Sequence, residues 1–352
     1  MSHHARRGVL GRGAGGGGST SYYLAVGHDV SPYLTVYPWS ASGFGAKFAN
    51  PATLPAGYCY GVAFSPSGDA VAACHGTSPY ISAYPWSGSG FGAKFANPAT
   101  LPTGDSWKLA FAPAGDAIAV VNIAASPYVS VYHWSSVGFG TKFSNPTTLP
   151  PGGGISVAFS PSGNAIAIGT GGAPYIAAYP WSASGFGTKF ANPVTAIPSF
   201  GRGVAFSPDG AALAIAHNAP PNATVYNWST SGFGTKFTNP ATLPGLNGFE
   251  VAFSPTGDTI AVSTDSTPVI SAYAWSASGF GTKFADPATL PTGTGYSVAF
   301  SPSGTEIAVA HWNSPFVTAY PWSASGFGTK FTNPTTLPAG GGFSVAFGAI
   351  TS

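Results

Sequence analysis

Side chains that could carry chemistry are scarce in this sequence, and they form no familiar catalytic motif. The chain of 352 residues has 10 acidic residues, 12 Lys and Arg together, 7 His and 2 Cys. It contains neither a His-Glu-x-x-His metal motif nor the glycine-rich P-loop that binds phosphate. We therefore expect no catalytic residue, no metal site and no cofactor, and we predict a protein that is not an enzyme.

Four of the histidines recur at one position of a repeated unit, just after a short apolar segment. Asn122, Thr170 and Thr264 fill the same position in other units. A metal ion holds its ligands within about 2 Å, and equivalent positions of separate repeats should lie much farther apart. We therefore expect these histidines to cap strand ends through hydrogen bonds. They are His28, His75, His217 and His311.

The two cysteines, Cys59 and Cys74, flank a predicted hairpin. Its turn is Ser65-Pro66-Ser67-Gly68, a sequence that suits a type I turn. If Ser65 pairs with Gly68, the register places Cys59 directly opposite Cys74. A cross-strand disulfide is then possible, and two buried free thiols are an equally good alternative.

A repeat of 47 residues, with one step of 48, organises almost the whole chain. Each unit carries one Trp and one Val/Leu-Ala-Phe triplet, so both landmarks occur seven times. In the unit that begins at residue 61, four short apolar segments cover residues 61–64, 70–73, 80–84 and 91–95. Four strands per repeat of this length are typical of a propeller blade. The Trp positions are 39, 86, 134, 181, 228, 275 and 322.

The fold class we predict is all-β, a seven-bladed β-propeller of four-stranded blades. Residues 22–26 match the second strand of a unit, and residues 343–347 match the first. The C-terminal strand should therefore pair with the N-terminal blade and close the ring. We expect a propeller over residues 21–352 and a flexible, glycine-rich basic arm over residues 1–20, which has no apolar stretch typical of a secretory signal.

Each repeat also places one Lys in its predicted fourth strand. Lysine on an exposed edge strand discourages pairing with another sheet. We prefer this interpretation to a belt of lysines that binds phosphate. The seven lysines are Lys47, Lys94, Lys142, Lys189, Lys236, Lys283 and Lys330.

The repeats differ from one another mainly in two segments, the loop after the second strand and the residues that lead into the first. In an up-and-down blade both segments lie on the same face, so we expect this face to bind a ligand or partner. Aromatic side chains would provide stacking contacts, and charged ones would provide polar anchors. The alternative is that the aromatic rings only plug the channel and pack between blades. The predicted binding residues are Tyr60, Trp107, Lys108, Arg202, Phe249, Glu250, Tyr296 and Phe343, with Trp312 on the rim.

The repeat resembles the WD-repeat propellers in its first strand and turn. Residues 298–304 are Val-Ala-Phe-Ser-Pro-Ser-Gly, and residues 204–210 differ from them by one Asp. The family's Trp-Asp pair is Trp-Ser here, as in Trp86-Ser87, and its Gly-His pair is absent. The amino-acid sequence of the repeats is most similar to that of the very regular propellers of bacteriophage virions and bacteria.

That resemblance implies a non-enzymatic virion protein, a capsid or tail decoration or an adhesin, at the virion or extracellular surface. A lectin-like glycan-binding propeller of a bacterial surface or secreted protein is the second hypothesis, and an enzyme that uses the channel is the third. Expected partners are other virion or surface proteins, reached through the arm and its Arg6, Arg7 and Arg12. A host glycan or host surface protein is a further candidate partner. With 6% charged residues and a net charge of +2, we expect neither nucleic-acid binding nor membrane insertion.

Overall fold

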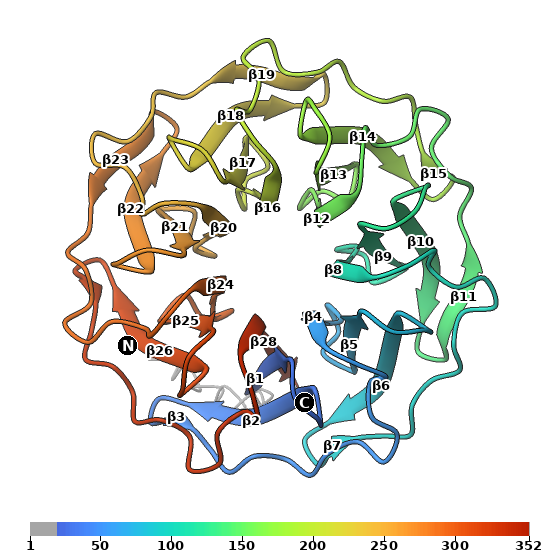
Figure 1. Ribbon diagram of the computed structural model, residues 1–352, viewed down its shortest axis with the longest axis vertical. Helices are drawn as coiled ribbons and strands as arrows, with labels where there is room; N and C mark the ends of the chain where they lie inside the picture. The colour runs from blue at the N-terminus through green and yellow to red at the C-terminus, as the bar shows by residue number, and fades with distance from the viewer. Residues whose placement is uncertain (1–19, 352) are drawn as a thin grey trace, which may run out of the picture.

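Seven four-stranded antiparallel sheets surround a central axis in the computed structural model, which describes residues 20–351 (Figure 1). This arrangement is a seven-bladed β-propeller and confirms the fold class predicted from the repeat. The basic arm predicted over residues 1–20, including its arginines, lies almost entirely outside the described residues. Among the residues described, no helix is long and apolar enough to cross a membrane.

The strands nearest the axis are the innermost members of the seven sheets. They are β4 (Cys59–Phe64), β8 (Ser106–Phe111), β12 (Gly154–Phe159), β16 (Gly201–Phe206), β20 (Gly248–Phe253), β24 (Gly295–Phe300) and β28 (Gly342–Thr351). The second strands are β1 (Thr20–His28), β5 (Ala70–His75), β9 (Ala117–Asn122), β13 (Ala165–Thr170), β17 (Ala212–His217), β21 (Thr259–Thr264) and β25 (Glu306–His311).

The third and outermost strands complete each sheet. The third strands are β2 (Leu34–Ser40), β6 (Ile81–Ser87), β10 (Val129–Ser135), β14 (Ile176–Ser182), β18 (Ala223–Ser229), β22 (Ile270–Ser276) and β26 (Val317–Ser323). The outermost are β3 (Gly43–Phe44), β7 (Gly90–Phe91), β11 (Gly138–Lys142), β15 (Gly185–Phe186), β19 (Gly232–Lys236), β23 (Gly279–Lys283) and β27 (Gly326–Phe327).

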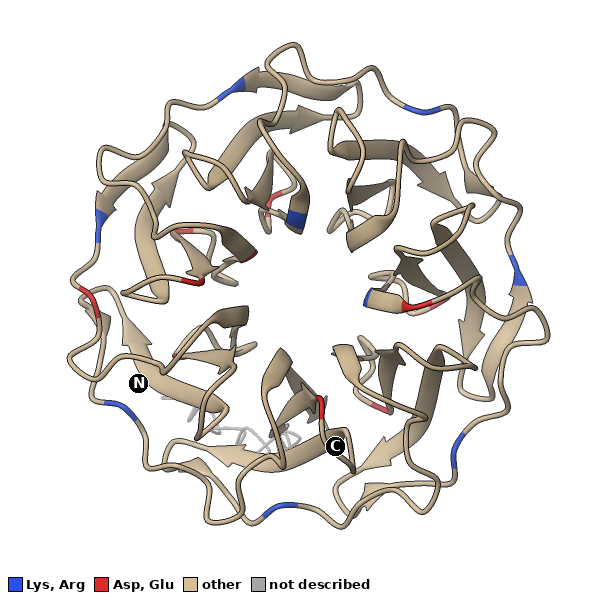
Figure 2. Cartoon of the chain, in the orientation of Figure 1, with Lys and Arg blue, Asp and Glu red and all other residues tan. Residues whose placement is uncertain are grey.

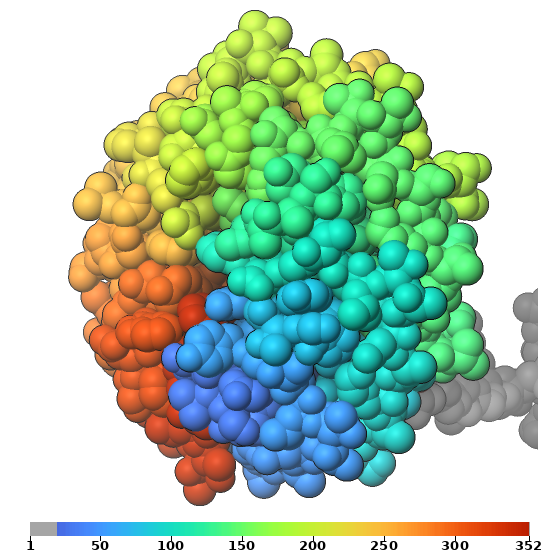
Figure 3. Space-filling model, turned by 45° about the vertical axis from the view of Figure 1, so that its right-hand side comes forward, coloured from blue at the N-terminus to red at the C-terminus, as the bar shows by residue number. Residues whose placement is uncertain are grey.

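Blade 1 is built from both ends of the described chain and closes the ring. Its sheet has the order β28-β1-β2-β3, and blades 2 to 7 follow in chain order from β4 to β27. Leu24 pairs with Phe347 and Ala25 with Ala346 across β1 and β28, as the alignment of the termini predicted. The N-terminal and C-terminal colours of Figure 3 accordingly lie side by side. Pairing with β28 covers the edge of β1 that would otherwise be unpaired.

The core consists of seven apolar clusters between neighbouring blades. The repeated Trp supplies the largest side chain of each. Trp86 of blade 2, for example, is 4% exposed and meets Tyr23 of blade 1 edge to face at 5.3 Å and Phe48 at 5.0 Å between ring centroids. Removal of a buried ring of this size usually costs about 3–5 kcal/mol, so these contacts hold adjacent blades together.

The second strands are buried on both faces, because a blade has a neighbour on each side. All six residues of β5 and of β17 are buried. Such strands need small or branched apolar side chains at every position rather than an alternating pattern. This explains runs such as Ala70-Val71-Ala72-Ala73 in the sequence.

The loops between second and third strands vary in sequence but share two backbone features. In each of the seven, a cis X-Pro bond is followed by a non-glycine residue with positive φ, such as Tyr80 at 67°.

The repeated lysines lie on the outer circumference of the ring (Figure 2). In each repeat the Lys amine donates a hydrogen bond to the side chain three residues further along, an Asn in six repeats and Asp286 in the seventh. Each lysine is thus held by its own repeat.

The register predicted for the two cysteines is wrong. The hairpin pairs Phe64 with Val71 and Gly61 with Cys74, whereas Cys59 pairs with His75. The turn is longer than expected, since the Ser65 amide donates to the Ala70 carbonyl at 2.9 Å, and a bulge interrupts β4 after Cys59. Cys59 therefore does not face Cys74 directly, and both residues are buried free thiols rather than a disulfide.

Candidate functional site

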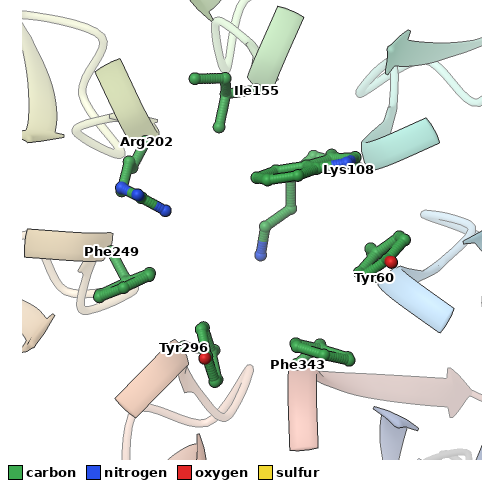
Figure 4. Close-up of a pocket in the computed structure, with 8 residues that line it drawn as sticks. Tyr60, Lys108, Ile155, Arg202, Phe249, Tyr296 and Phe343 are labelled. Carbon is green, nitrogen blue, oxygen red and sulfur yellow. The ribbon is translucent and has the colours of Figure 1, made fainter. Parts of the chain in front are cut away.

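One side chain from the innermost strand of each blade points toward the axis at one end of the channel (Figure 4). Together with Lys108, these side chains line a cavity of about 340 Å³, which we call the axial pocket. The structure thus brings together most of the residues predicted from the variable segments. The lining residues are Tyr60, Trp107, Lys108, Ile155, Arg202, Phe249, Tyr296 and Phe343.

A β-bulge in each innermost strand explains why these side chains converge. In β12 the pairing with β13 passes from Gly154 directly to Ser156, which leaves Ile155 without a partner. The same shift occurs at Tyr60 in β4 and at Arg202 in β16, and all seven innermost strands contain it. A bulge re-aims the extra residue and is often found beside functional sites. The repeat therefore directs one variable side chain per blade into the axial pocket.

The aromatic rings of the pocket pack against one another at tilted or edge-to-face angles. Centroid distances are 5.1 Å from Tyr60 to Phe343, 5.1 Å from Phe343 to Tyr296 and 5.0 Å from Tyr296 to Phe249. These rings are half-buried rather than enclosed between blades, so part of each ring remains open to a ligand. Trp312 lies on the rim, 43% exposed and 5.6 Å from Phe343.

A single ion pair crosses the channel beside this aromatic wall. The Lys108 Nζ lies 2.5 Å from Glu250 Oε2, and the two side chains are only 17% and 13% exposed. Lys108 belongs to β8 and Glu250 to β20, which face each other across the ring (Figure 1). The pair is therefore held in place by blades on opposite sides of the axis.

Arg202 adds a second positive charge from blade 5. Its guanidinium carbon lies 4.5 Å above the centre of the Phe249 ring, and its Nε donates to the Asn218 side-chain oxygen. Burial lowers the pKa of this guanidinium, which remains charged at any physiological pH because its unperturbed pKa is above about 12. Two cations thus line a pocket whose other residues are mostly aromatic, and the Glu250 carboxylate pairs with the first of them.

The position after the bulge shows how the fold makes room for the charged pair. Ser156, Ser297 and Ser344 occupy it in three blades, and each hydroxyl accepts a hydrogen bond from the next blade's backbone amide, for example Val204 N–H at 3.1 Å. Glycine occupies it only in the blades that precede Lys108 and Glu250, as Gly61 and Gly203. A Cβ at position 203 would lie 2.6 Å from the Glu250 Cα and 2.7 Å from its Oε1.

We expect Gly203→Ala to destabilise the fold by about 1–3 kcal/mol, because β16 or β20 must move to admit the methyl group. Chemical denaturation measures this change as a lower midpoint. Gly88→Ala is the control, because a Cβ there meets only the Tyr23 hydroxyl at 3.5 Å and Ala stands at the equivalent position 183. Equal midpoints for the two variants would contradict the proposed crowding.

Three carboxylates near the pocket were not predicted as site residues. The pKa of Tyr60 is raised by burial and by the negative charges of Asp105 and Asp29, and that of Tyr296 by burial and by Asp265 and Asp29. All three acids fall in the two variable segments, which was the signal available in the sequence. Ile155 occupies the same variable position as Tyr60 and was not predicted as a site residue.

The four recurring histidines hydrogen-bond at strand ends, as expected from their position. In His75 the Nδ1 lies 2.7 Å from the Thr77 carbonyl and the Nε2 lies 3.1 Å from the Ser82 hydroxyl. Since a carbonyl can only accept, Nδ1 carries the hydrogen and Nε2 accepts from Ser82. Burial lowers the pKa of each of these histidines to about 4. Over residues 20–351, no three His, Cys, Asp or Glu side chains are grouped so as to hold a metal ion.

The chain is similar over almost its whole length to several solved structures, some of which have names that refer to lactonases. A proposed 6-phosphogluconolactonase from Bacteroides uniformis has a TM-score of 0.71 at 16% identity, covering 93% of this chain and 99% of that one. The periplasmic gluconolactonase PpgL of Pseudomonas aeruginosa has 0.68 at 17%, covering 94% and 100%. A protein from Lactobacillus plantarum has 0.72 at 16%, covering 94% and 99%. At this identity the similarity establishes the fold.

The sequence itself matches no family model and no curated protein. The resemblance to WD-repeat proteins is therefore supported only as far as the propeller architecture.

The comparison contradicts the functions expected from the sequence. Similar structures are named as lactonases, which are enzymes, and not as virion proteins or lectins. The prediction of a non-enzymatic virion or glycan-binding propeller was therefore wrong. Lys108 and Glu250, far apart in the sequence, were interpreted separately as polar anchors, whereas the ring joins them in one ion pair across the channel.

Proposed function

We propose that this protein hydrolyses a small lactone in the axial pocket. The observation that carries the proposal is the ion pair, at 2.5 Å, between Glu250 and Lys108, a residue that lines the pocket. The rest of the lining is mostly aromatic. A volume of about 340 Å³ suits a small ring, since ligand pockets usually start at about 300 Å³. The names of the similar propellers support the same reaction class.

Glu250 would act as the general base. Its carboxylate takes a proton from water, and the oxygen of that water forms a bond to the lactone carbonyl carbon. The carbonyl oxygen becomes an oxyanion, which the Lys108 ammonium stabilises. The bond between the ring oxygen and the carbonyl carbon then breaks, and the ring oxygen receives the proton from Glu250. The product is the open hydroxy acid, so lactone plus water is fully accounted for.

Arg202 would bind the carboxylate of the hydroxy acid product. Its guanidinium is oriented by Asn218 and by the Phe249 ring, and a guanidinium is well suited to bind a carboxylate. Release of an anionic product into solvent then passes the half-exposed Trp312 on the rim. As part of the same proposal we place the protein outside the cytoplasm, because one similar propeller is periplasmic.

The direct test is acid release from a panel of uncharged γ- and δ-lactones, recorded by pH-stat with purified protein. We expect turnover above the buffer rate for at least one ring size. Lys47→Met, on the outer circumference, serves as a control that removes a charge far from the pocket and should leave the rate unchanged. Failure to hydrolyse any lactone in the panel would overturn the proposal.

A further inference from the structure

A second cavity, of about 230 Å³, lies beside the axial pocket and shares Tyr60 with it. It is formed by the loops that precede and follow the strands of blades 1, 2 and 3, which are neighbours in the ring (Figure 1). We call it the tyrosine cavity. Apart from alanine and glycine, its lining consists of Tyr33, Tyr58, Tyr60, Thr77 and Asp105.

The three tyrosine rings of this cavity are inclined to one another. The ring centroids of Tyr58 and Tyr60 are 6.4 Å apart with an interplanar angle of 80°, and those of Tyr33 and Tyr58 are 6.4 Å apart at 49°. Gly76 brings the neighbouring loop close to this wall, since a Cβ there would lie 3.2 Å from the Tyr60 ring. Tyr58 is 52% exposed, so a ligand can enter from solvent. The negative faces of such rings attract a cation.

The charge of the tyrosine cavity is negative. Asp105 is the one charged side chain in its lining, and neither of the two ion pairs found within residues 20–351 involves it. The pKa of Tyr60 is raised by burial and further by the negative charges of Asp105 and Asp29. The axial pocket differs, because its lining includes two cations. A ligand of the tyrosine cavity must therefore supply the positive charge.

The hydrogen-bonding groups of the cavity define that ligand further. A carboxylate such as that of Asp105 only accepts hydrogen bonds, and the hydroxyls of Thr77 and of the tyrosines can accept as well as donate. A primary ammonium group has three donors, no acceptor and one positive charge. A neutral polyol can bond to the same hydroxyls but leaves the charge of Asp105 unbalanced.

The repeat shows that this combination is particular to one place in the ring. At the equivalent place three blades further on, Tyr175 and Phe200 pack at 5.9 Å between ring centroids, as Tyr33 and Tyr58 do. Arg202 stands there in the position of Tyr60, and Asn247 stands in the position of Asp105. An aromatic pair is thus present in both places, but the negative charge belongs to the tyrosine cavity alone of the two.

We propose that the tyrosine cavity binds the primary ammonium group of a small organic molecule, which donates to the Asp105 carboxylate and lies against the tyrosine rings. This binding site goes beyond the lactone hydrolysis proposed for the axial pocket and does not depend on it.

The test is a titration of the full chain followed by ligand NMR at low ionic strength, because salt screens exposed charges. The probes are n-propylammonium, 1-propanol, propionate, glucose and n-propyltrimethylammonium. We expect n-propylammonium to bind, and 1-propanol and propionate to bind at least about tenfold more weakly. Asp105→Asn should weaken n-propylammonium binding by about tenfold. Asp116→Asn is the matched control, since Asp116 is exposed in the turn at the other end of β8, and should leave the affinity unchanged.

A second pair of variants tests the aromatic wall. Tyr58→Ser should weaken n-propylammonium binding by about threefold through loss of one ring. Phe200→Ser, at the equivalent repeat position and 43% exposed, should have no effect. Urea midpoints equal to that of the wild type would show that the variants fold.

Several results would overturn the proposal. One is an affinity for n-propylammonium that does not change in Asp105→Asn, and another is no measurable binding of this probe to the wild type. Tighter binding of glucose would assign the cavity to neutral polyols, and tighter binding of n-propyltrimethylammonium would exclude a role for the ammonium hydrogens. None of these results bears on lactone hydrolysis, which is tested separately by acid release.

Discussion

Acidification from about pH 7 to about pH 5 is expected to lower the free energy of unfolding by about 2 kcal/mol for each of four buried histidines. These histidines are fully buried, and burial lowers their pKa from 6.5 to about 4. Because the pKa of each histidine is lower in the folded state, the unfolded chain binds more protons than the folded chain between about pH 4 and pH 6.5. Stability is therefore complete above about pH 6.5 and falls as the pH drops toward 4.

The sum over His28, His75, His217 and His311 approaches the whole stability of a typical domain, about 5–15 kcal/mol. Asp209 affects stability in a lower pH range, because the hydrogen bond from the Ser207 hydroxyl holds the pKa of its carboxyl below the usual value. Its contribution to stability is therefore lost only at more acidic pH.

The repeat itself supplies the control for this prediction. Thr replaces the histidine in two blades as Thr170 and Thr264, whose hydroxyls donate to loop carbonyls at 2.9 and 3.0 Å. A variant with Thr at all four histidine positions should therefore fold, and its urea midpoint should depend much less on pH between about 7 and 5. An identical loss of stability in wild type and variant over this range would show that other groups cause the acid sensitivity.

Glu250→Gln is expected to lower kcat/KM for lactone hydrolysis by about 10²–10⁴-fold, the usual contribution of a general base. The amide keeps the size of the side chain but cannot take the proton from water. Lys108→Met should lower the rate by about 10²–10³-fold through loss of oxyanion stabilisation. Rates are measured with the best lactone of the panel, at several pH values.

Stability must be separated from chemistry in these variants, because either substitution leaves one shielded charge without its partner. The double variant Glu250→Gln with Lys108→Met removes both charges and should fold while remaining inactive. Glu306→Gln is the matched control, since the Glu306 carboxylate lies outside the axial pocket and accepts from Ser303. If Glu250→Gln retained full activity, Glu250 could not be the base.

The repeat pattern in the sequence was sufficient to predict the architecture. The spacing of Trp86 and its six counterparts predicted the length of one blade. The match of residues 343–347 to a first strand predicted that the C-terminus closes the ring. These features are local, because each depends on strand-length patterns that recur along the chain. For the same reason, variation among the copies was enough to predict that the residues leading into the innermost strands form a binding site.

Other features depended on pairing and on the ring, and only the tertiary structure decided them. The bulge at Tyr60 and the longer turn after Ser65 shifted the register of Cys59, and no local pattern distinguishes a bulge from regular pairing. The Lys108–Glu250 pair exists because blades 3 and 6 face each other across the axis. Chain order predicts which blades are neighbours, but contact between side chains across the channel depends on the diameter of the ring and on the direction of the side chains that follow each bulge.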